Sequence, residues 1–401
     1  MLHLNHIDRA SAKAILKESQ HAFFAKNENL NVHAYSNAIV RQGFAYAGVW
    51  HNEQRLPHTW LHRGFEHEPL VLNGHCDCAT PPKENMIHEE VVFVGSFNAC
   101  WGHEITDHLK HFWFYFNEHY QHLKHLKLIY TLIFDKKPTH NFFELLEYLG
   151  IHQKQLQCIE KPTQFKTIYV PDECFFYDLN LKCRRYTKEY IEILNKLPTF
   201  ENQNTPKKIY FSRTQTNCWK DYNELELENF FKNQGFSIFY PEKLNFKEEL
   251  TLLQNAEVFA ATEGSIAHNV VFCKNLKNAL ILRKCAHFTQ YQLTLNSLLP
   301  NQTNIVYINC GYSPFADRAP EWWIGPFFMY ESNYLRRYFH LKPKFFPLFK
   351  FLKLHWKLLK EMPFKKRLSF LDHTFLGWSH PFRAQLKIGT RIKQFKNLFK
   401  K

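Results

Sequence analysis

Short apolar runs alternate with amphipathic segments through the second half of the chain. Apolar runs rich in β-branched and aromatic residues predict strands at 207–212, 236–241, 257–262, 278–284 and 304–309. Apolar residues at helical spacing predict helices between them, at 223–235, 245–256 and 266–273. The second of these helices opens with Asn245 and has Glu248 three residues later, which resembles a capping box. Strands and helices that alternate at this pitch predict right-handed βαβ units around a parallel sheet.

The first half of the chain alternates in the same way, although less regularly. Its apolar runs predict strands at 69–74, 90–97, 127–135 and 166–171. Its amphipathic segments predict helices at about 8–26, 103–120, 140–149 and 184–197. Between the two halves, residues 197–208 are polar, flanked by prolines and without apolar periodicity, so we expect a linker there.

These patterns predict an α/β protein with two domains and a tail. A chain of 401 residues with 45% hydrophobic residues is long enough to build two separate cores. The expected parts are an N-terminal α/β domain at 1–197, a linker at 198–208, a second α/β domain at 209–340 and a basic helical tail at 341–401.

The formal net charge of +14 is concentrated in the tail. Residues 341–401 hold 16 Lys and Arg against 2 acidic residues, whereas the remainder of the chain is balanced. Within 344–360, Phe, Leu and Trp alternate with Lys at nearly helical spacing, which is typical of a helix that lies on an anionic membrane surface. Two alternatives remain: ordinary packing of terminal helices, or nucleic-acid binding. No zinc-finger spacing, heptad zipper or aromatic RNA-binding signature supports the second, so we expect no nucleic-acid partner.

Targeting and cysteine patterns indicate a cytoplasmic protein. No apolar run reaches the roughly 20 residues that cross a bilayer, and the first residues lack the pattern of a signal peptide. Ten cysteines without repeated spacing predict reduced thiols. His75, Cys76 and Cys78 could offer ligands to zinc, but no second pair of ligands follows at the usual spacing. We therefore expect neither a metal nor a cofactor.

Polar residues follow two of the predicted strands in the second domain. In an open α/β sheet, ligands bind beyond the carboxyl ends of the strands. Arg213 stands where a guanidinium could hold a phosphate, and the turn around Gly264 opens a helix whose free N–H groups suit a diphosphate. Alternatively, Arg213 pairs with a carboxylate and Gly264 only serves the turn. The candidates are Ser212, Arg213, Glu263, Gly264, Ser265, His268 and Asn269.

A second candidate site follows the strand expected at 90–97. The segment nearly matches the zinc motif H-E-x-x-H, but Asp107 occupies the position of the second His. If a helix begins near Gly102, His103 and Asp107 share one face. A His and a carboxylate on one face fit general-base chemistry better than zinc ligation, and either group could take the proton. An ion pair without a catalytic role is the alternative.

Residues 208–272 resemble the C-terminal core of family 61 glycosyltransferases. The resemblance rests on a K-x-Y-x-S-R strand at 208–213, an N-E helix start at 223–224, a G-F-x-[IV]-x-x-P-E strand at 235–242, and a small-residue loop at 264–265 followed by Asn269. The family also carries a G-H-x-x-x-D-x-L stretch, which is matched by Gly102, His103, Asp107 and Leu109.

This resemblance implies a GT-B-like arrangement, in which two Rossmann-like lobes face a cleft. The second lobe would hold a nucleotide-sugar donor and the first an acceptor, with inversion at the anomeric carbon and no obligatory metal. Asp107 or His103 would deprotonate the acceptor hydroxyl, while Arg213 would stabilise the departing diphosphate. The resemblance adds Glu224 and Lys220 to the donor site, Lys220 standing where many members have a second Arg. Glu263 stands where many members have His, so it would contact a sugar or ribose hydroxyl.

The expected function is an inverting glycosyltransferase that builds a surface glycan such as lipopolysaccharide or capsule. The acceptor would be a lipid-linked glycan, and the tail at 341–401 would hold the enzyme at the inner face of the cytoplasmic membrane. One alternative is a metal-dependent hydrolase that uses His103 and Asp107. Another is a non-catalytic membrane-binding or glycan-binding relative, in which Glu263 marks a decayed donor site.

Overall fold

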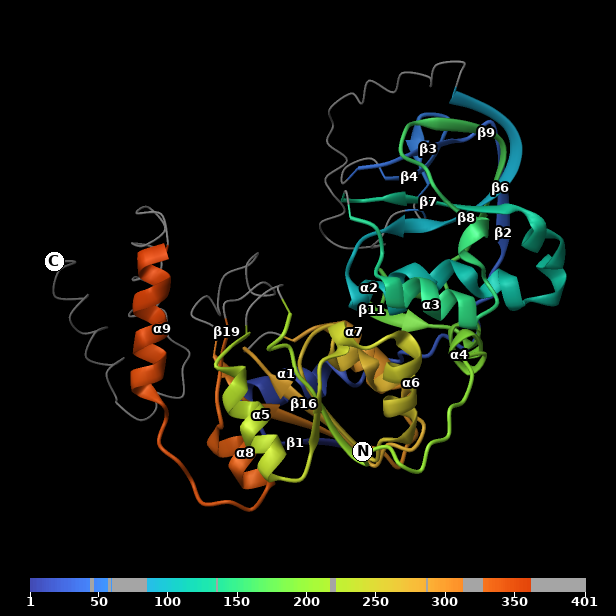
Figure 1. The fold of residues 1–401 in the computed structure, drawn as a ribbon. Coiled ribbons are helices and arrows are strands. Elements are labelled where there is room, and N and C mark those ends of the chain that lie inside the picture. Colours follow the sequence, from blue (N-terminus) through green and yellow to red (C-terminus); the bar gives the residue numbers. More distant parts are fainter. Residues whose placement is uncertain are drawn as a thin grey trace.

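The protein has a mixed α/β fold with two large sheets (Figure 1). The computed structural model describes residues 1–43, 47–56, 59, 85–134, 136–216, 221–285, 288–312 and 327–361. Several expectations lie outside these residues: the strand at 69–74, the possible zinc ligands His75, Cys76 and Cys78, the donor-site candidate Lys220, and the tail beyond residue 361.

The sheet of the second lobe has six parallel strands. Their order is β1-β17-β16-β15-β12-β14, and every neighbouring pair is parallel. The strands are β1 (Leu2–His6), β12 (Lys208–Phe211), β14 (Ser237–Phe239), β15 (Val258–Thr262), β16 (Asn278–Arg283) and β17 (Asn304–Asn309). The five strands expected in the second half of the chain are therefore confirmed, as is the parallel sheet.

Helices cover both faces of this sheet. They are α1 (Arg9–Glu18), α5 (Glu224–Asn233), α6 (Phe246–Asn255), the 3₁₀-helix η8 (Ala267–Phe272), α7 (Gln290–Asn296) and α8 (Asn333–Tyr338). Alternate strand residues point to opposite faces, so Tyr210 and Leu280 pack with α5 and α8, whereas Phe211 and Ile281 pack with α6, η8 and α7. The capping box of Asn245 at the start of α6 is confirmed.

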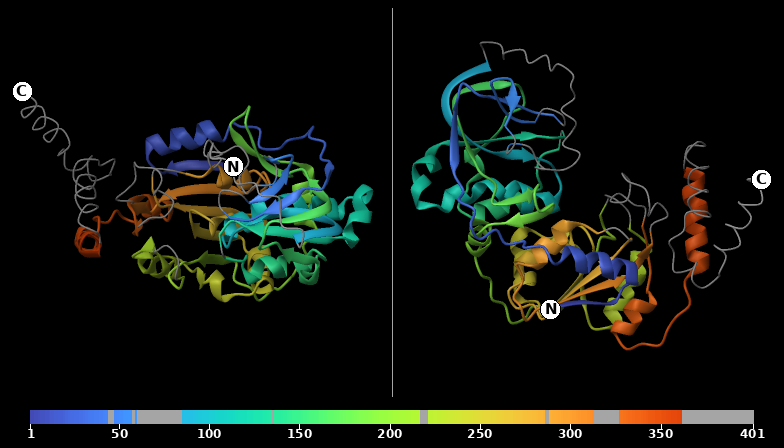
Figure 2. Two further views of the ribbon diagram at one scale, coloured as in Figure 1. Left: turned by 90° about the horizontal axis from the view of Figure 1, so that it is seen from above. Right: turned by 180° about the vertical axis from the view of Figure 1, so that it is seen from behind.

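The first strand and helix of the chain lie with the second sheet. Leu2 of β1 pairs in parallel with Ile305 of β17, and α1 follows along the same sheet (Figure 2). Asp8 caps α1 through the N–H of Ser11 at 2.9 Å and also accepts a hydrogen bond from the Asn309 side chain at 2.9 Å. The structure thus differs from the expected division at 1–197, because the chain begins in the second lobe and then crosses to the first.

The sheet of the first lobe is mixed rather than parallel. Its order is β5-β4-β3-β9-β6-β7-β8, and β2 also pairs with β9. Four strands are mutually parallel, namely β6 (Met86–Phe97), β7 (Lys127–Leu132), β8 (Leu156–Cys158) and β9 (Thr163–Pro171). The antiparallel strands are β2 (Val32–Ser36), β3 (Ile39–Arg41), β4 (Gly48–His51) and β5 (Gln54–Arg55). The expectation of a Rossmann-like first lobe therefore fits only the part around β6 and β7.

Two further expectations in this lobe differ from the structure. The helix expected at 184–197 begins later, as α4 (Lys188–Asn195), because residues before it form the hairpin of β10 (Phe175–Asp178) and β11 (Cys183–Tyr186). The helix expected at 103–120 is four short segments: α2 (Trp101–His103), the π-helical turn η3 (Glu104–His108), and the 3₁₀-helices η4 (Leu109–Phe116) and η5 (Glu118–His125).

The irregular winding of this segment has a physical reason. Residues three apart lie on one face of a 3₁₀-helix. In η4 this brings Lys110 and Trp113 to the same neighbouring segment, where Lys110 Nζ lies 2.6 Å from Glu173 Oε1 and Trp113 Nε1 donates to Asp172 O at 2.7 Å. Both side chains are buried, so these contacts satisfy groups that water cannot reach.

The two lobes pack directly against each other. In Figure 1 the helix α3 (His140–Tyr148) of the first lobe faces α6 of the second, and one hydrophobic core runs through both lobes. Glu144 of α3 accepts a hydrogen bond at 2.6 Å from the N–H of Phe246, the first residue of α6. The linker expected at 198–208 packs alongside α6, since the N–H of Phe200 donates to Gln254 Oε1 at 2.8 Å. The lobes therefore share an ordered, largely apolar interface.

Part of the basic tail forms a helix, as expected. This helix, α9 (Leu348–Glu361), packs on β19 (Phe327–Met329), which pairs with β13 (Asp221–Tyr222) and β18 (Gly311–Tyr312) in a small sheet. Within the described ranges, no helix is both long enough and apolar enough to cross a bilayer.

Candidate active site

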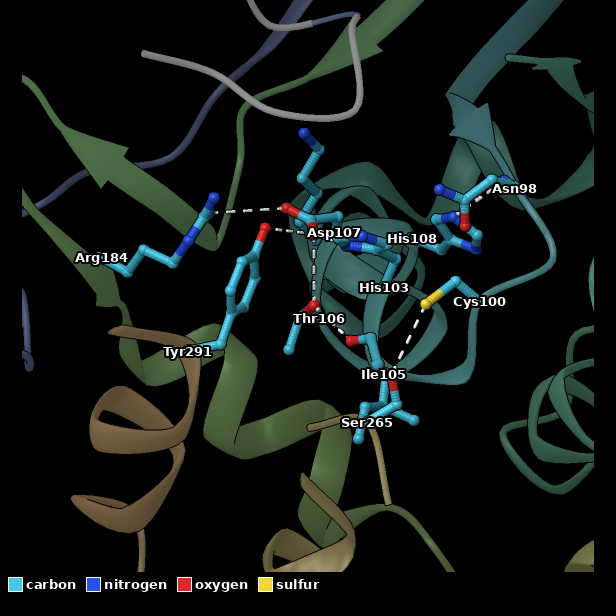
Figure 3. A network of polar contacts seen from close by, with 12 residues as sticks. Asn98, Cys100, His103, Ile105, Thr106, Asp107, His108, Arg184, Ser265 and Tyr291 are labelled. Carbon is cyan, nitrogen blue, oxygen red and sulfur yellow. Dashed lines mark hydrogen bonds and ion pairs between the residues drawn. The ribbon is translucent and has the colours of Figure 1, made fainter. Parts of the chain in front are cut away.

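A polar cluster surrounds Asp107 in the π-helical turn that follows β6 (Figure 3). His103 Nδ1 lies 2.8 Å from Asp107 Oδ2. The hydroxyl of Tyr291, which comes from α7 in the second lobe, donates to the same oxygen at 2.7 Å. Arg184 of β11 places Nη1 3.6 Å from the other oxygen, Oδ1. The His and Asp expected on one face are thus brought together.

Burial differs sharply between the two members of this pair. The side chain of Asp107 is 2% exposed, whereas that of His103 is 25% exposed. A carboxylate that holds Nδ1 of an imidazole fixes the ring orientation and its tautomer, so the basic lone pair lies on the other nitrogen, Nε2. The arrangement can therefore carry out general-base chemistry through His103, with Asp107 as the buried partner.

Two side chains missed by the sequence reasoning complete this cluster. Burial raises the pKa of the Tyr291 hydroxyl well above its usual range, so it remains a donor to Asp107. The Arg184 guanidinium lies 3.6 Å from the centre of the Tyr291 ring. No local pattern marks either residue, because the two come from elements that only tertiary folding brings together.

The segment before His103 is docked on the loop after β15. Trp101 Nε1 donates to Asn269 Oδ1 at 2.6 Å, and Cys100 Sγ lies 3.5 Å from Ser265 Oγ. A Cβ on Gly102 would lie 2.7 Å from Ser265 Oγ and 2.9 Å from His268 Nδ1, which is closer than such atoms approach. The Gly is therefore required for close approach between the lobes, and Ser265 and Asn269 act here as interface residues.

His268 is a neutral, buried member of the same interface. Burial, with the nearby His103 as a second cause, lowers its pKa to about 3. Its ring stacks on that of Tyr291 with the ring centres 6.0 Å apart. It therefore contributes no positive charge at neutral pH.

A second cluster lies at the carboxyl ends of β12 and β16. Asp221 Oδ2 lies 2.6 Å from Lys284 Nζ and 3.7 Å from Arg213 Nη1. Burial, together with the charge of Arg213, lowers the pKa of Lys284. Sequence reasoning found Arg213 but missed Lys284, because the strand was expected to run through 284, whereas β16 ends at Arg283 and Lys284 directly follows it. This cluster brings two cationic side chains to a strand end, where an anion could bind.

Glu224 is part of this cluster, but it faces protein groups. It accepts hydrogen bonds from Tyr210 Oη at 2.7 Å and from the N–H of Arg213 at 3.2 Å. Burial, with nearby Asp221 as a second cause, raises its pKa to about 7. The carboxyl thus positions the backbone of Arg213.

Glu263 and Ser212 also have partners within the protein. Glu263 is buried with Oε2 3.5 Å from Arg283 Nε, and burial raises its pKa. Ser212 is fully buried and donates to Glu228 Oε1 at 2.6 Å. Gly264 has a φ of +123°, a conformation that favours glycine. Glu263 therefore takes part in an internal ion pair, and its expected contact with a sugar or ribose hydroxyl stays a prediction.

The loop after β15 connects the two clusters. Thr262, the last residue of β15, donates to Asp221 Oδ2 at 3.4 Å, and Ser265, three residues later, contacts the segment that leads to His103. The candidate base and the strand-end cations thus lie on either side of one short loop.

Glu104, the acidic residue of the near-zinc motif, has a structural role. It is buried, and it accepts hydrogen bonds from the N–H of Thr139 at 2.6 Å and from its hydroxyl at 2.5 Å, at the start of α3. Burial raises the pKa of this carboxyl to about 7. Throughout the ranges that the structure describes, no three His, Cys, Asp or Glu side chains gather in a way that could hold a metal.

The titration of Glu104 predicts a pH dependence of stability. The folded protein binds this proton more tightly than the unfolded chain, so stability falls as pH rises from about 4.5 to about 7, by up to roughly 3 kcal/mol. Glu104→Gln removes the titration and keeps both hydrogen bonds, because the Thr139 hydroxyl can also accept. In urea unfolding, the free energy of unfolding of the variant should rise relative to that of the wild type by about that amount between about pH 4.5 and about pH 8. The exposed Glu118→Gln is the matched control, and parallel pH profiles for Glu104→Gln and wild type would contradict the assignment.

Comparison with known proteins agrees with the resemblance described above. The model of the Glycosyltransferase 61 family matches residues 101–279, just under half of the chain. The match begins at Trp101 and therefore covers the His103–Asp107 pair, Arg213 and the loop after β15. No curated protein matches the chain significantly. The chain is thus similar to glycosyltransferase family 61 over residues 101–279, which supports a transferase enzyme.

Proposed function

We propose that the protein transfers a sugar, with inversion, from a nucleotide-sugar donor to a hydroxyl of a glycan acceptor, and that His103 is the general base. The observation that supports this most directly is the hydrogen bond between His103 Nδ1 and the buried Asp107, while the imidazole keeps access to solvent. This arrangement favours His103 over Asp107, because both Asp107 oxygens already have protein partners.

The proposed step is a single displacement. His103 Nε2 takes the proton of the acceptor hydroxyl as its oxygen attacks the anomeric carbon from the face opposite the leaving group. The bond from that carbon to the nucleotide diphosphate breaks as the new glycosidic bond forms. Asp107 stabilises the imidazolium that results, in the way a buried carboxylate does in other His–Asp pairs.

The strand-end cluster is the proposed site of the diphosphate. A leaving nucleotide diphosphate gains negative charge in the transition state, and preorganised cations stabilise that charge. Arg213 and Lys284 supply two cationic side chains, and Asp221 serves as their internal counter-ion while no donor is bound. Glu224 and Ser212 support this site from behind, the loop of Glu263, Gly264 and Ser265 borders it, and Lys220 remains a proposed donor contact from the sequence.

The proposed architecture is of the GT-B type, with a donor lobe and an acceptor lobe. The parallel six-stranded sheet, with cations at its strand ends, supports the assignment of the second lobe to the donor. The acceptor is proposed to be a lipid-linked glycan of a surface polysaccharide, at the inner face of the cytoplasmic membrane. The basic residues of 341–401 support this proposal, because an anionic bilayer would hold them.

A thermal-shift screen of nucleotide sugars tests the donor class. We expect at least one nucleotide sugar to raise the melting temperature, and to do so equally with a chelator present. The donor that binds is then supplied with glycan acceptors, and the anomeric configuration of the product is read by NMR. Retention of configuration would overturn the inverting mechanism. Donor binding without transfer to any acceptor would favour the non-catalytic alternative.

A further inference from the structure

We infer that one face of α9 docks on an anionic lipid surface. This inference assigns the contact to particular side chains, beyond the general charge of the tail. The face consists of Phe345, just before the helix, and of Phe349, Leu352 and Trp356 on it; we call this set the outer face of α9. Their exposed fractions are 98%, 88%, 47% and 63%. The spacing of Phe349, Leu352 and Trp356, three and then four residues, places these three side chains on one stripe of α9, and Phe345 precedes them in the chain.

The opposite face of α9 fixes the helix to the protein. Phe351 is 3% exposed and its ring centre lies 5.5 Å from that of Phe328 on β19. The ring centre of Phe346 lies 5.0 Å from that of Tyr330. Lys350 Nζ forms an ion pair with Glu226 Oε2 at 2.7 Å. Because Phe351 packs on β19, the outer face lies on the side of α9 away from β19.

The charges around the outer face indicate which kind of partner binds there. Lys353, Lys357 and Lys360 are exposed on the same helix, and Lys360 Nζ lies 5.5 Å from the centre of the Trp356 ring. A Trp beside lysines is typical of the boundary between lipid headgroups and acyl chains. A second copy of the chain would bring the same lysines against one another, whereas an anionic bilayer would neutralise them. The face therefore fits an anionic bilayer better than a dimer contact.

The anchoring strand also leads directly to the strand-end cluster. In β19, Phe328 contacts α9, and its neighbour Phe327 pairs in the sheet with Asp221 and lies 5.3 Å from Lys284 Nζ. A bilayer on the outer face would thus be separated from the cations proposed to hold the donor by α9 and one strand. The lipid contact deepens the membrane location in the proposed function, and its relation to the donor site rests on that function.

Vesicle binding by the full-length protein tests the inference. The probes are phosphatidylcholine vesicles with and without phosphatidylglycerol, separated by sedimentation. Phe349→Ser combined with Trp356→Ser should weaken binding to the anionic vesicles by on the order of tenfold or more, because two large apolar side chains no longer enter the interface. The matched control is Phe134→Ser combined with Leu181→Ser, which removes two exposed apolar side chains from the first lobe and should leave binding unchanged.

The remaining outcomes each decide against the inference or separate it from the proposed function. Equal binding of the α9 variant and wild type would mean that charge in the rest of the tail suffices. If the wild type binds vesicles with and without phosphatidylglycerol equally well, the partner is not an anionic surface. If light scattering shows that the wild type is a dimer and that the α9 variant is a monomer, the outer face serves self-association and not lipid binding. Nucleotide-sugar binding in solution is measured on the same variants and should not change, so failure of the donor proposal would be seen separately.

Discussion

His103→Ala should reduce turnover by two to four orders of magnitude, the usual contribution of a positioned general base. The folded state should survive this change, because the imidazole is partly exposed and lies outside the main core. Donor affinity, measured by calorimetry, should be close to that of the wild type, since His103 is proposed to act on the acceptor. The loss should therefore fall on kcat, with the melting temperature as the control for folding.

A double variant separates the two possible assignments of the base. If Asp107 acts only through His103, Asp107→Asn should be damaging alone but should add little to His103→Ala, because residues that work as one unit are not additive. If Asp107 were the base, Asp107→Asn would be the more severe single change, and the double variant would lose more than His103→Ala does. Tyr291→Phe provides a milder test, since it removes one hydrogen bond to Asp107 and keeps the ring.

Arg213→Ala should weaken nucleotide-sugar binding by two to three orders of magnitude. A guanidinium can make two charge-assisted hydrogen bonds to a diphosphate, each worth about 1.5 to 3 kcal/mol. The fold should tolerate the loss, because Asp221 keeps its ion pair with Lys284 at 2.6 Å. Arg213→Lys should give an intermediate affinity, since an ammonium keeps the charge without the fork.

Calorimetric titration with the nucleotide sugar found in the screen gives the measurement. Arg185→Ala is the matched control, because this Arg is paired with an Asp in the first lobe, with Nη1 2.8 Å from Asp178 Oδ2. It should leave donor affinity unchanged. An affinity for Arg213→Ala equal to that of the control would remove Arg213 from the donor site.

Local sequence patterns predicted most of the second lobe. Strands of one parallel sheet are buried on both faces, so they stand out as short apolar runs, and the capping residue Asn245 marks a helix start without help from distant segments. The pairing of His103 with Asp107 could also be predicted, because four residues of separation suffice to define it.

Long-range contacts account for what could not be predicted. Tyr291 and Arg184 reach Asp107 only after both lobes have folded, and Glu263 finds its Arg283 partner across two neighbouring strands. The short antiparallel strands of the first sheet lack long apolar runs, so their pattern is weak. The winding around Lys110 follows contacts with a segment some sixty residues away, as shown by its ion pair with Glu173.

The pairing of β1 with β17 imposes an order on how this protein can fold during synthesis. Leu2 can pair only after Ile305 has been synthesised, so the first strand of the second sheet is translated long before its neighbour. Closing a loop of this length is slow relative to local pairing, and the first lobe can fold in the meantime. The edge of the second sheet beside β17 is therefore the last to be covered on the nascent chain. Until then, another unpaired strand can occupy it, which makes this edge the place where exchange between newly made copies would begin.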